Sequence, residues 1–458
     1  RDSLYTNRCG KPVDELWTNL GPEVINISYT GSRSIIHRVI QIDFSSISAF
    51  LTGFSTYPQP LRLRLRIFTI FFLYKQTHQT VRKGELSTIM KLVFDKADLV
   101  KSVGIAMKAV SGKTTMPILE CILIDASSNV IKFTSNDMEL GIETIVTGMI
   151  LERGIVALDA KIFSEIVRKL PDNQVTIETD ENLVTTITCE KAKFNIPGQS
   201  GEDFSYLPIL ETSDCVSISQ FTLKELIRQT IFSIAANENN KLMTGELFEI
   251  KDNTLRVVSL DGHRIAIRRI ELKDSYPDRK VVVPGKTLNE ISKILSGEMD
   301  DQIDIYFSEN HIMFKFDDTT VVSRLIDGEY FRIDQMLSSD YETKVTINKK
   351  EFLSCIDRAT LLVKEGDKKP IIIDIQDGAM ELQINSAMGS MKEEIDINKE
   401  GKDIMIGFNP KFLIDALRVI DDEEISIYLV NPKAPCFIRN EEESYIYLIL
   451  PVNFNSVR

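Results

Sequence analysis

Residues 156–170 read VALDAKIFSEIVRKL, a short apolar strand that runs directly into an amphipathic helix. Related stretches follow at 283–295, which reads VPGKTLNEISKIL, and at 407–420, which reads GFNPKFLIDALRVI. A lysine occupies the same place in each stretch, and successive lysines are 125 residues apart: Lys161, Lys286 and Lys411. A fixed spacing of this size indicates an internal repeat, and three copies of one domain are therefore expected.

A second recurring unit lies earlier in each third, where an apolar strand segment is followed by a polar residue. It reads LVFDKADL at 92–99, FTLKEL at 221–226 and VTINKKEF at 345–352. Short polar side chains accept hydrogen bonds from the first N–H groups of a helix. We therefore expect helix caps at Asp95, Thr222 and Asn348. The equivalent apolar positions are Leu99, Leu226 and Phe352.

Two helices and several strands are predicted for each third. The helices are expected at 95–110, 160–170, 222–236, 285–295, 348–363 and 410–420. One apolar face of the second helix is expected to consist of Ile162, Ile166, Val167 and Leu170. Alternating apolar and polar residues predict half-buried strands, with hairpins, at 175–179, 303–307, 312–316, 425–429 and 445–448. The predicted fold class is α+β, with repeated domains of two helices on antiparallel sheet at 90–214, 215–339 and 340–458.

Residues 1–89 differ from the rest of the chain. They contain the only tryptophan, Trp17, and carry a net charge of +5, whereas the remainder carries −18. Their one apolar run, at 67–74, is far shorter than the roughly 20 residues that span a bilayer. Lys83-Gly84-Glu85 can be encoded by AAA-GGA-GAA, a purine-rich ribosome-binding sequence shortly before Met90. We interpret 1–89 as a segment outside the native protein; a poorly ordered native extension is the alternative.

The composition is that of an ordinary globular protein, with 43% hydrophobic and 26% charged residues and a net charge of −13. It excludes wholesale disorder and a polytopic membrane protein. Six cysteines without a CxxC pair argue against a disulfide framework or a zinc ribbon and favour a reducing cytoplasm. No metal or other cofactor is expected.

Charge is distributed unevenly over residues 90–458. The six expected helices carry 15 basic and 8 acidic residues, a net +7, so the strands and loops carry −25. Either lysine and arginine are present simply as good helix formers on solvated faces, or the helices form one basic surface that faces a polyanion.

Two motifs could suggest enzyme chemistry. Ser111-Gly112-Lys113-Thr114 resembles the end of a phosphate-binding loop, but Met107 stands where that loop needs glycine. Asp261-Gly262-His263-Arg264 could be a catalytic cluster or a sharp turn after a strand at 255–259. An enzyme such as a nucleotide hydrolase using this loop is therefore kept as an alternative hypothesis.

From Met90 to about Val452 the chain resembles the bacterial DNA polymerase III beta subunit, the sliding clamp. The resemblance is carried by MPIL at 116–119, TSNDME at 134–139, LDGHRIA at 260–266, RLIDGEY at 324–330, IGFN at 406–409 and LILPV at 448–452. It implies a ring of two head-to-tail subunits around duplex DNA, with helices lining the hole. The acidic total then fits a protein whose positive charge is confined to its inner wall.

The resemblance also implies a pocket between the second and third domains for short peptide motifs of polymerases and of the clamp loader. Its expected residues are Leu242, Met243, Leu260, Gly262, His263, Arg264, Ile265, Phe412, Pro435, Leu448, Leu450, Pro451 and Val452. Family members commonly end with an arginine after the Pro-aliphatic pair, whereas this chain continues from Asn453 to Arg458.

Two further surfaces are expected. The resemblance implies DNA contacts at Lys113 and Asn237, and charge adds the helix cations Arg228, Lys286, Lys293, Lys411 and Arg418. At the subunit interface, Phe194 is expected to meet Leu361 and Leu362, and Lys191 and Lys193 to face Glu393 and Glu394.

The function implied is topological tethering without catalysis. The expected partners are a second copy of the chain, duplex DNA bound irrespective of sequence, the DNA polymerase III alpha subunit, other polymerases and an ATP-driven clamp loader, with no membrane. Besides the enzyme hypothesis, a peptide scaffold that does not encircle DNA remains an alternative.

Overall fold

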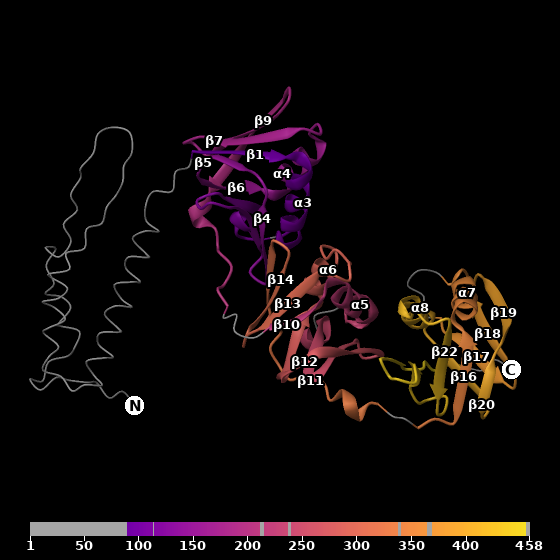
Figure 1. The fold of residues 1–458 in the computed structure, drawn as a ribbon. Helices are drawn as coiled ribbons and strands as arrows, with labels where there is room; N and C mark the ends of the chain where they lie inside the picture. The colour runs from indigo at the N-terminus through magenta and orange to yellow at the C-terminus, as the bar shows by residue number, and fades with distance from the viewer. Residues whose placement is uncertain are drawn as a thin grey trace, which may run out of the picture. The chain divides into compact units, whose positions relative to one another are not determined.

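The computed structural model describes residues 89–112, 114–210, 215–236, 240–337, 340–363 and 369–454. All of them belong to one unit of the chain, Ser87–Arg458, and are drawn in colour in Figure 1. The interpretation of residues 1–89 concerns residues that, apart from Ile89, lie outside this description, and so do the predicted DNA contacts Lys113 and Asn237.

The first third has two α-helices on antiparallel strands. Its elements are β1 (Met90–Asp95), α3 (Lys96–Ala106), η4 (Met107–Ala109), η5 (Pro117–Glu120), β2 (Cys121–Asp125), β3 (Ile131–Asn136), β4 (Leu140–Val146), β5 (Met149–Glu152), β6 (Ile155–Asp159), α4 (Ala160–Lys169), β7 (Gln174–Thr179), β8 (Val184–Cys189), β9 (Ala192–Ser200) and η6 (Gly201–Asp203). Asp95 precedes α3 as expected but makes no capping hydrogen bond through its side chain.

The apolar face expected for α4 is partly wrong. Phe163 and Val167 are fully buried, whereas Ile162 is 49% exposed. Neighbouring residues of an α-helix point about 100° apart, so a face centred on Phe163 and Val167 turns Ile162 toward solvent. The aromatic side chain, and not the adjacent isoleucine, decides how the helix packs.

The second third has the same build. Its elements are β10 (Cys215–Ser219), α5 (Gln220–Thr230), η7 (Ile231–Ser233), η8 (Lys241–Thr244), β11 (Gly245–Leu260), β12 (Arg264–Pro284), α6 (Gly285–Ser292), β13 (Gln302–Phe307), β14 (His311–Phe316), β15 (Thr319–Arg324) and η9 (Ile333–Gln335). The expected cap Thr222 is wrong. Ser219 caps α5 by accepting a hydrogen bond from the Thr222 N–H at 3.0 Å, so the helix begins before Thr222.

The last third completes the repeat. Its elements are β16 (Thr343–Asn348), α7 (Lys349–Thr360), β17 (Ile371–Gln376), β18 (Ala379–Ser386), β19 (Gly389–Asp396), β20 (Asn398–Gly401), β21 (Ile404–Phe408), α8 (Pro410–Val419), β22 (Glu424–Leu429), β23 (Cys436–Arg439) and β24 (Tyr445–Ile449). Asn348 caps α7, as expected, by accepting a hydrogen bond from the Glu351 N–H at 3.1 Å.

The sheets continue from one third into the next, which the sequence patterns did not predict. A 13-stranded sheet joins the first and second thirds where β15 pairs with β4. A 7-stranded sheet joins the second and third thirds where β12 pairs with β24. A 4-stranded sheet of β19, β18, β17 and β21 lies within the last third.

Each third has its own apolar core. The repeat-equivalent residues Leu99, Leu226 and Phe352 are buried in three different cores, which confirms that the recurring helices dock alike. A fourth cluster forms at the border of the second and third thirds. The described cysteines are unpaired, and four of the five are buried: Cys121, Cys189, Cys355 and Cys436.

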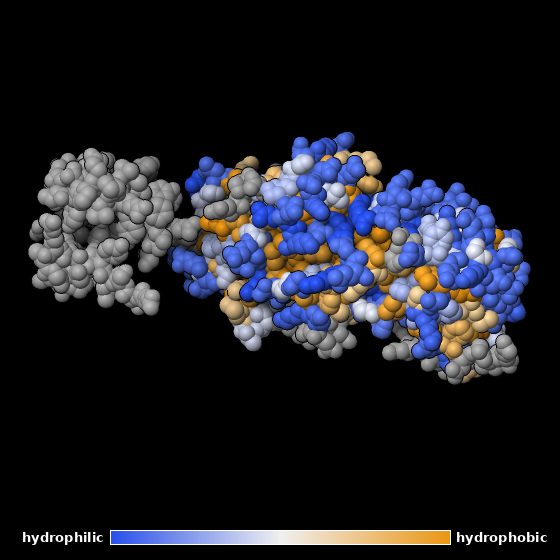
Figure 2. Space-filling model, turned by 90° about the horizontal axis from the view of Figure 1, so that it is seen from below, coloured by the Kyte–Doolittle hydropathy of each residue, from blue (hydrophilic) through white to orange (hydrophobic). Residues whose placement is uncertain are grey.

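The surface is mainly hydrophilic on the face drawn in Figure 2, with apolar patches between the polar residues. Among the described residues, no helix has the length and apolar character that crossing a membrane requires.

Candidate functional sites

The α-helices of the described residues form one continuous row. In each third the two helices pack against each other: α3 with α4, α5 with α6, and α7 with α8. Across the second border α5 contacts α8, and across the first border Lys108 of η4 lies 4.0 Å from Glu290 of α6. The row therefore runs through all three thirds.

Most predicted DNA-contacting cations in this row are already paired with an acid. Lys293 lies 2.7 Å from Glu290, and Arg418 lies 3.3 Å from Asp357. Lys286 pairs with Asp137, which follows β3 in the first third. Lys411 forms no ion pair with any residue that the structure describes. Four of the five described cations that were predicted to contact DNA are therefore paired with an acid of the same chain.

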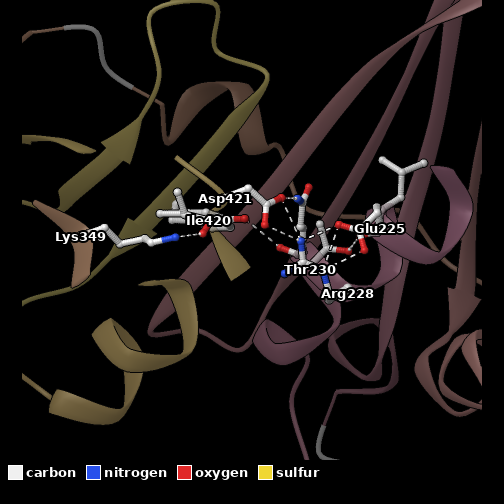
Figure 3. A network of polar contacts seen from close by, with 9 residues as sticks. Glu225, Arg228, Thr230, Lys349, Ile420 and Asp421 are labelled. Carbon is white, nitrogen blue, oxygen red and sulfur yellow. Dashed lines mark hydrogen bonds and ion pairs between the residues drawn. The ribbon is translucent and has the colours of Figure 1, made fainter. Parts of the chain in front are cut away.

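Arg228 belongs to a larger network between the second and third thirds (Figure 3). Its guanidinium donates to Glu225 at 2.9 Å and to Asp421 at 3.0 Å, and Gln229 Nε2 also donates to Asp421 at 3.1 Å. The hydrogen bond to Glu225 is the main cause that raises the Arg228 pKa, so this side chain stays charged. Lys349 donates to the Ile420 carbonyl at 2.5 Å, which ties α7 to the end of α8.

The predicted pocket residues come together where β12 pairs with β24. Ile265 lies opposite Leu448, and the Leu450 N–H donates to the His263 carbonyl at 2.9 Å. Leu260, Ile265 and Leu448 are buried in the cluster at this border, and Leu242 and Met243 pack against it. After β24 the chain passes through Pro451 to Val452, and the Val452 N–H donates to the Gly407 carbonyl. Pro435 comes directly before β23, the strand that pairs with β24.

Arg264 is the centre of this arrangement and is only 7% exposed. Its guanidinium donates to Asp261 at 3.1 Å, to Asp415 at 2.7 Å and to the Phe232 carbonyl at 2.5 Å. The Phe412 ring lies 4.6 Å from the guanidinium carbon, and the His263 ring stacks on Phe412 at 5.9 Å. Arg264 therefore joins β12 to α8 and holds the aromatic side chain that borders the predicted pocket.

The Asp261–Arg264 loop has the geometry of a capped turn. Gly262 has a φ of +85°, which glycine adopts without strain. Asp261 Oδ1 accepts hydrogen bonds from the N–H groups of His263 and Arg264 at 3.0 and 3.1 Å. The carboxylate is thus occupied in shaping the turn, which favours the loop interpretation over a catalytic cluster. Within the described parts of the chain, no group of three or more His, Cys, Asp or Glu could hold a metal ion.

Two residues that hold Arg264, Phe232 and Asp415, were not predicted for this site. Asp415 lies three residues after Phe412 on α8, so both project from one helix face. The sequence feature that could have indicated Asp415 is an acid on the same helix face as Phe412, a predicted pocket residue. A cavity of about 460 Å³ lies beside the cluster, but none of the predicted pocket residues lines it; its lining includes Leu247, Arg256, Lys280, Tyr330, Phe331 and Asp334.

The predicted interface residues lie at two strand edges in different thirds. Lys193 and Phe194 are on β9, whose first part pairs only with β8, and Phe194 is 39% exposed. Glu393 and Glu394 are on β19, which pairs only with β18.

Leu361 and Leu362 follow α7, next to the second edge. Leu361 is 75% exposed, and Leu362 packs against the core of the last third. Within the chain Glu393 is paired with Arg358, which lowers the Glu393 pKa, and Lys191 is exposed in the turn before β9. One edge thus presents lysines and the other presents glutamates.

Three α+β units of two helices each, joined through their sheets and sharing one row of helices, define the DNA clamp class. Models of the N-terminal, central and C-terminal domains of the DNA polymerase III beta subunit match residues 90–208, 217–331 and 334–453. The chain is 33% identical over 375 residues to the beta sliding clamp of Staphylococcus epidermidis, covering 80% of this chain and 99% of that protein.

Solved structures agree. A DNA polymerase III beta subunit from Eubacterium rectale is 72% identical with a TM-score of 0.78, and the Bacillus subtilis DNA polymerase sliding clamp is 35% identical with a TM-score of 0.77. Each alignment covers 80% of this chain and all of the solved chain. The chain belongs to the DNA polymerase III beta subunit family.

Proposed function

We propose that this protein is a DNA sliding clamp: two copies close into a ring around duplex DNA and tether a DNA polymerase to its template, without catalytic activity of their own. The continuous row of helices carries the proposal, because the helices that bear the predicted DNA-facing cations follow one another through all three domains. Contacts between cations and phosphates need no particular base sequence, which suits a protein that must slide.

The ring requires a second copy of the chain. A head-to-tail contact joins two different surfaces of identical subunits, and it closes only if the rotation returns to the start. The β9 edge with Lys191, Lys193 and Phe194, and the β19 edge with Glu393, Glu394 and Leu361, differ in charge and both expose an apolar side chain. Two such contacts in a homodimer satisfy both free edges.

The pocket around Phe412 is proposed to take short, partly apolar peptides of the DNA polymerase III alpha subunit, other polymerases and an ATP-driven clamp loader. Leu242, Met243 and Leu450 offer apolar surface, and the exposed Gly262 lets a backbone approach closely. Since Arg264 fixes the Phe412 ring, the apolar wall is held in place before a peptide arrives.

The proposal is tested by loading the full chain onto nicked circular DNA with a clamp loader and ATP. A topologically linked ring remains on the circle through gel filtration and leaves when a nuclease linearises the DNA. Retention on linear DNA with free ends, or failure to be retained on circles, would contradict the proposal.

Charge reversal separates the clamp from a peptide scaffold. The variant with Lys286→Glu, Lys293→Glu and Lys411→Glu is expected to lose processive synthesis while it still binds a polymerase-derived peptide. The matched variant Phe412→Ala is expected to lose peptide binding and to keep the parent chain's affinity for linear duplex measured without a clamp loader. A scaffold that acts without DNA would keep its function in the first variant.

A further inference from the structure

Two cations of the helix row form ion pairs with acids on or directly after a neighbouring helix. Arg418 of α8 pairs with Asp357 of α7, and Arg228 of α5 pairs with Asp421, which follows α8. Both pairs join neighbouring helices, and the second crosses a domain border. Asp421 is 71% exposed and Asp357 is 45% exposed, so these carboxylates lie where a phosphate group could approach the same cations.

We propose that Asp357 and Asp421 act as built-in counterions that compete with DNA phosphates for Arg418 and Arg228. This inference rests on the proposed function, because it concerns the surface that faces the duplex. The acids keep the attraction between the ring and DNA weak. As the duplex moves, each cation exchanges its carboxylate partner for a phosphate and then returns to the carboxylate.

The energetics of exposed ion pairs fit such an exchange. An exposed pair contributes little stability, so a phosphate can replace the carboxylate without a large barrier. A cation that keeps its carboxylate neutralises no phosphate and releases no counterion from DNA. The number of effective phosphate contacts, and with it the salt dependence of binding, is therefore smaller than the number of cations in the row.

The structure supplies a matched control. Glu165 lies on α4 in the same row and is exposed, but it forms no ion pair with a residue that the structure describes. Glu165→Gln and Asp357→Asn each remove one negative charge from the row. Only Asp357→Asn also frees a cation, so a difference between the two variants reports the pairing and not the net charge.

The test measures binding of a fluorescent linear duplex by anisotropy, for the full chain, between 50 and 200 mM KCl. Asp357→Asn is expected to bind about two- to fivefold more tightly than the parent chain, which is the range of an exposed ion pair. The slope of log K against log salt concentration is expected to steepen by about 0.9 for one added phosphate contact. Adding Asp421→Asn is expected to steepen it by less, because Glu225 still accepts a hydrogen bond from Arg228 at 2.9 Å.

Glu165→Gln is expected to leave the slope unchanged. Equal slopes for Asp357→Asn and Glu165→Gln would overturn the inference while leaving the clamp function intact. A parent chain that neither binds duplex nor is retained on circles would instead overturn the proposed function and the inference with it.

Discussion

The two borders between the domains use the same backbone device and different side chains. At the first border Thr319 to Ser323 of β15 pair with Thr144 to Leu140 of β4, and at the second Arg264 to Arg268 of β12 pair with Ile449 to Tyr445 of β24. Each is an antiparallel ladder of five residue pairs. Across the first ladder the buried hydroxyls of Thr144 and Thr319 meet at 2.9 Å, whereas the second border buries the Arg264 guanidinium.

The difference explains why the candidate pocket is at the second border. A buried cation must be paired and hydrogen-bonded, because its desolvation is otherwise very unfavourable. Asp261, Asp415 and the Phe232 carbonyl meet this need from three separate segments. These partners fix the positions of the turn and of α8 relative to β12, which a pair of threonine hydroxyls cannot do.

Of the variants that test the difference between the two borders, the one that removes Arg264 should lower the free energy of unfolding the most. Arg264→Ala leaves Asp261 and Asp415 without their cation in a poorly solvated place, so we expect the free energy of unfolding to fall by about 3–5 kcal/mol. Urea denaturation measures the loss. The control is Arg269→Ala, since Arg269 is 30% exposed and 3.3 Å from Glu443, and its loss should cost less than about 1 kcal/mol. Equal losses would show that Arg264 does not hold the border.

Replacing Glu246 on β11 should change the free energy of unfolding by an intermediate amount. Burial raises the pKa of Glu246 well above the ordinary value, and the nearby Thr230 lowers it only in part. Neither carboxyl oxygen has a hydrogen-bond partner among the described residues. With a raised pKa in the folded state, the protein is most stable below the unfolded-state pKa and loses stability as the pH rises through the folded-state pKa.

Glu246→Met removes this buried acid. We expect the variant to be more stable than the parent by about 1–3 kcal/mol at pH 8 and by less at pH 5. Urea denaturation at the two pH values checks the trend. A gain that does not depend on pH would mean that the ionisation of Glu246 is not the cause.

The threonine pair at the first border should have the smallest effect and a distinctive pattern. Thr319→Val leaves the buried Thr144 hydroxyl without its partner and should cost about 1–2 kcal/mol. The double variant Thr144→Val and Thr319→Val removes both polar groups and should cost less than the single one. Thermal unfolding of the parent, the single variant and the double variant measures the order, and a double variant that loses more stability than the single one would contradict this role of the hydroxyl pair.

Much of the fold could be predicted because its signals are local. The repeat spacing and the apolar periodicity place six helices correctly among the described residues, and Asn348 caps α7 as expected. The local errors concern choices between residues close in sequence, such as Ser219 instead of Thr222 as a cap and Phe163 instead of Ile162 on the buried face. The chain geometry alone decides such choices, since one residue more or less turns a side chain by about 100°.

The candidate sites could be predicted only in part. The pocket residues were expected from the family resemblance, and the structure brings Leu260, Ile265 and Leu448 into one cluster. Phe232 and Asp415 were missed because nothing in their immediate sequence shows that they contact Arg264. The sequence also could not predict whether the helix cations are free or paired, since a count of charged residues does not say which acids lie near them in space.

The sequence by itself determined the threefold repeat, the α+β class and the excess of positive charge on the helices, because these follow from spacing, periodicity and composition. Only the tertiary structure decided that the sheets continue across the domain borders and that Arg228 is held by Asp421, 193 residues away along the chain. Strand pairing and charge pairing depend on distances in space, and those distances exist only once the chain has folded.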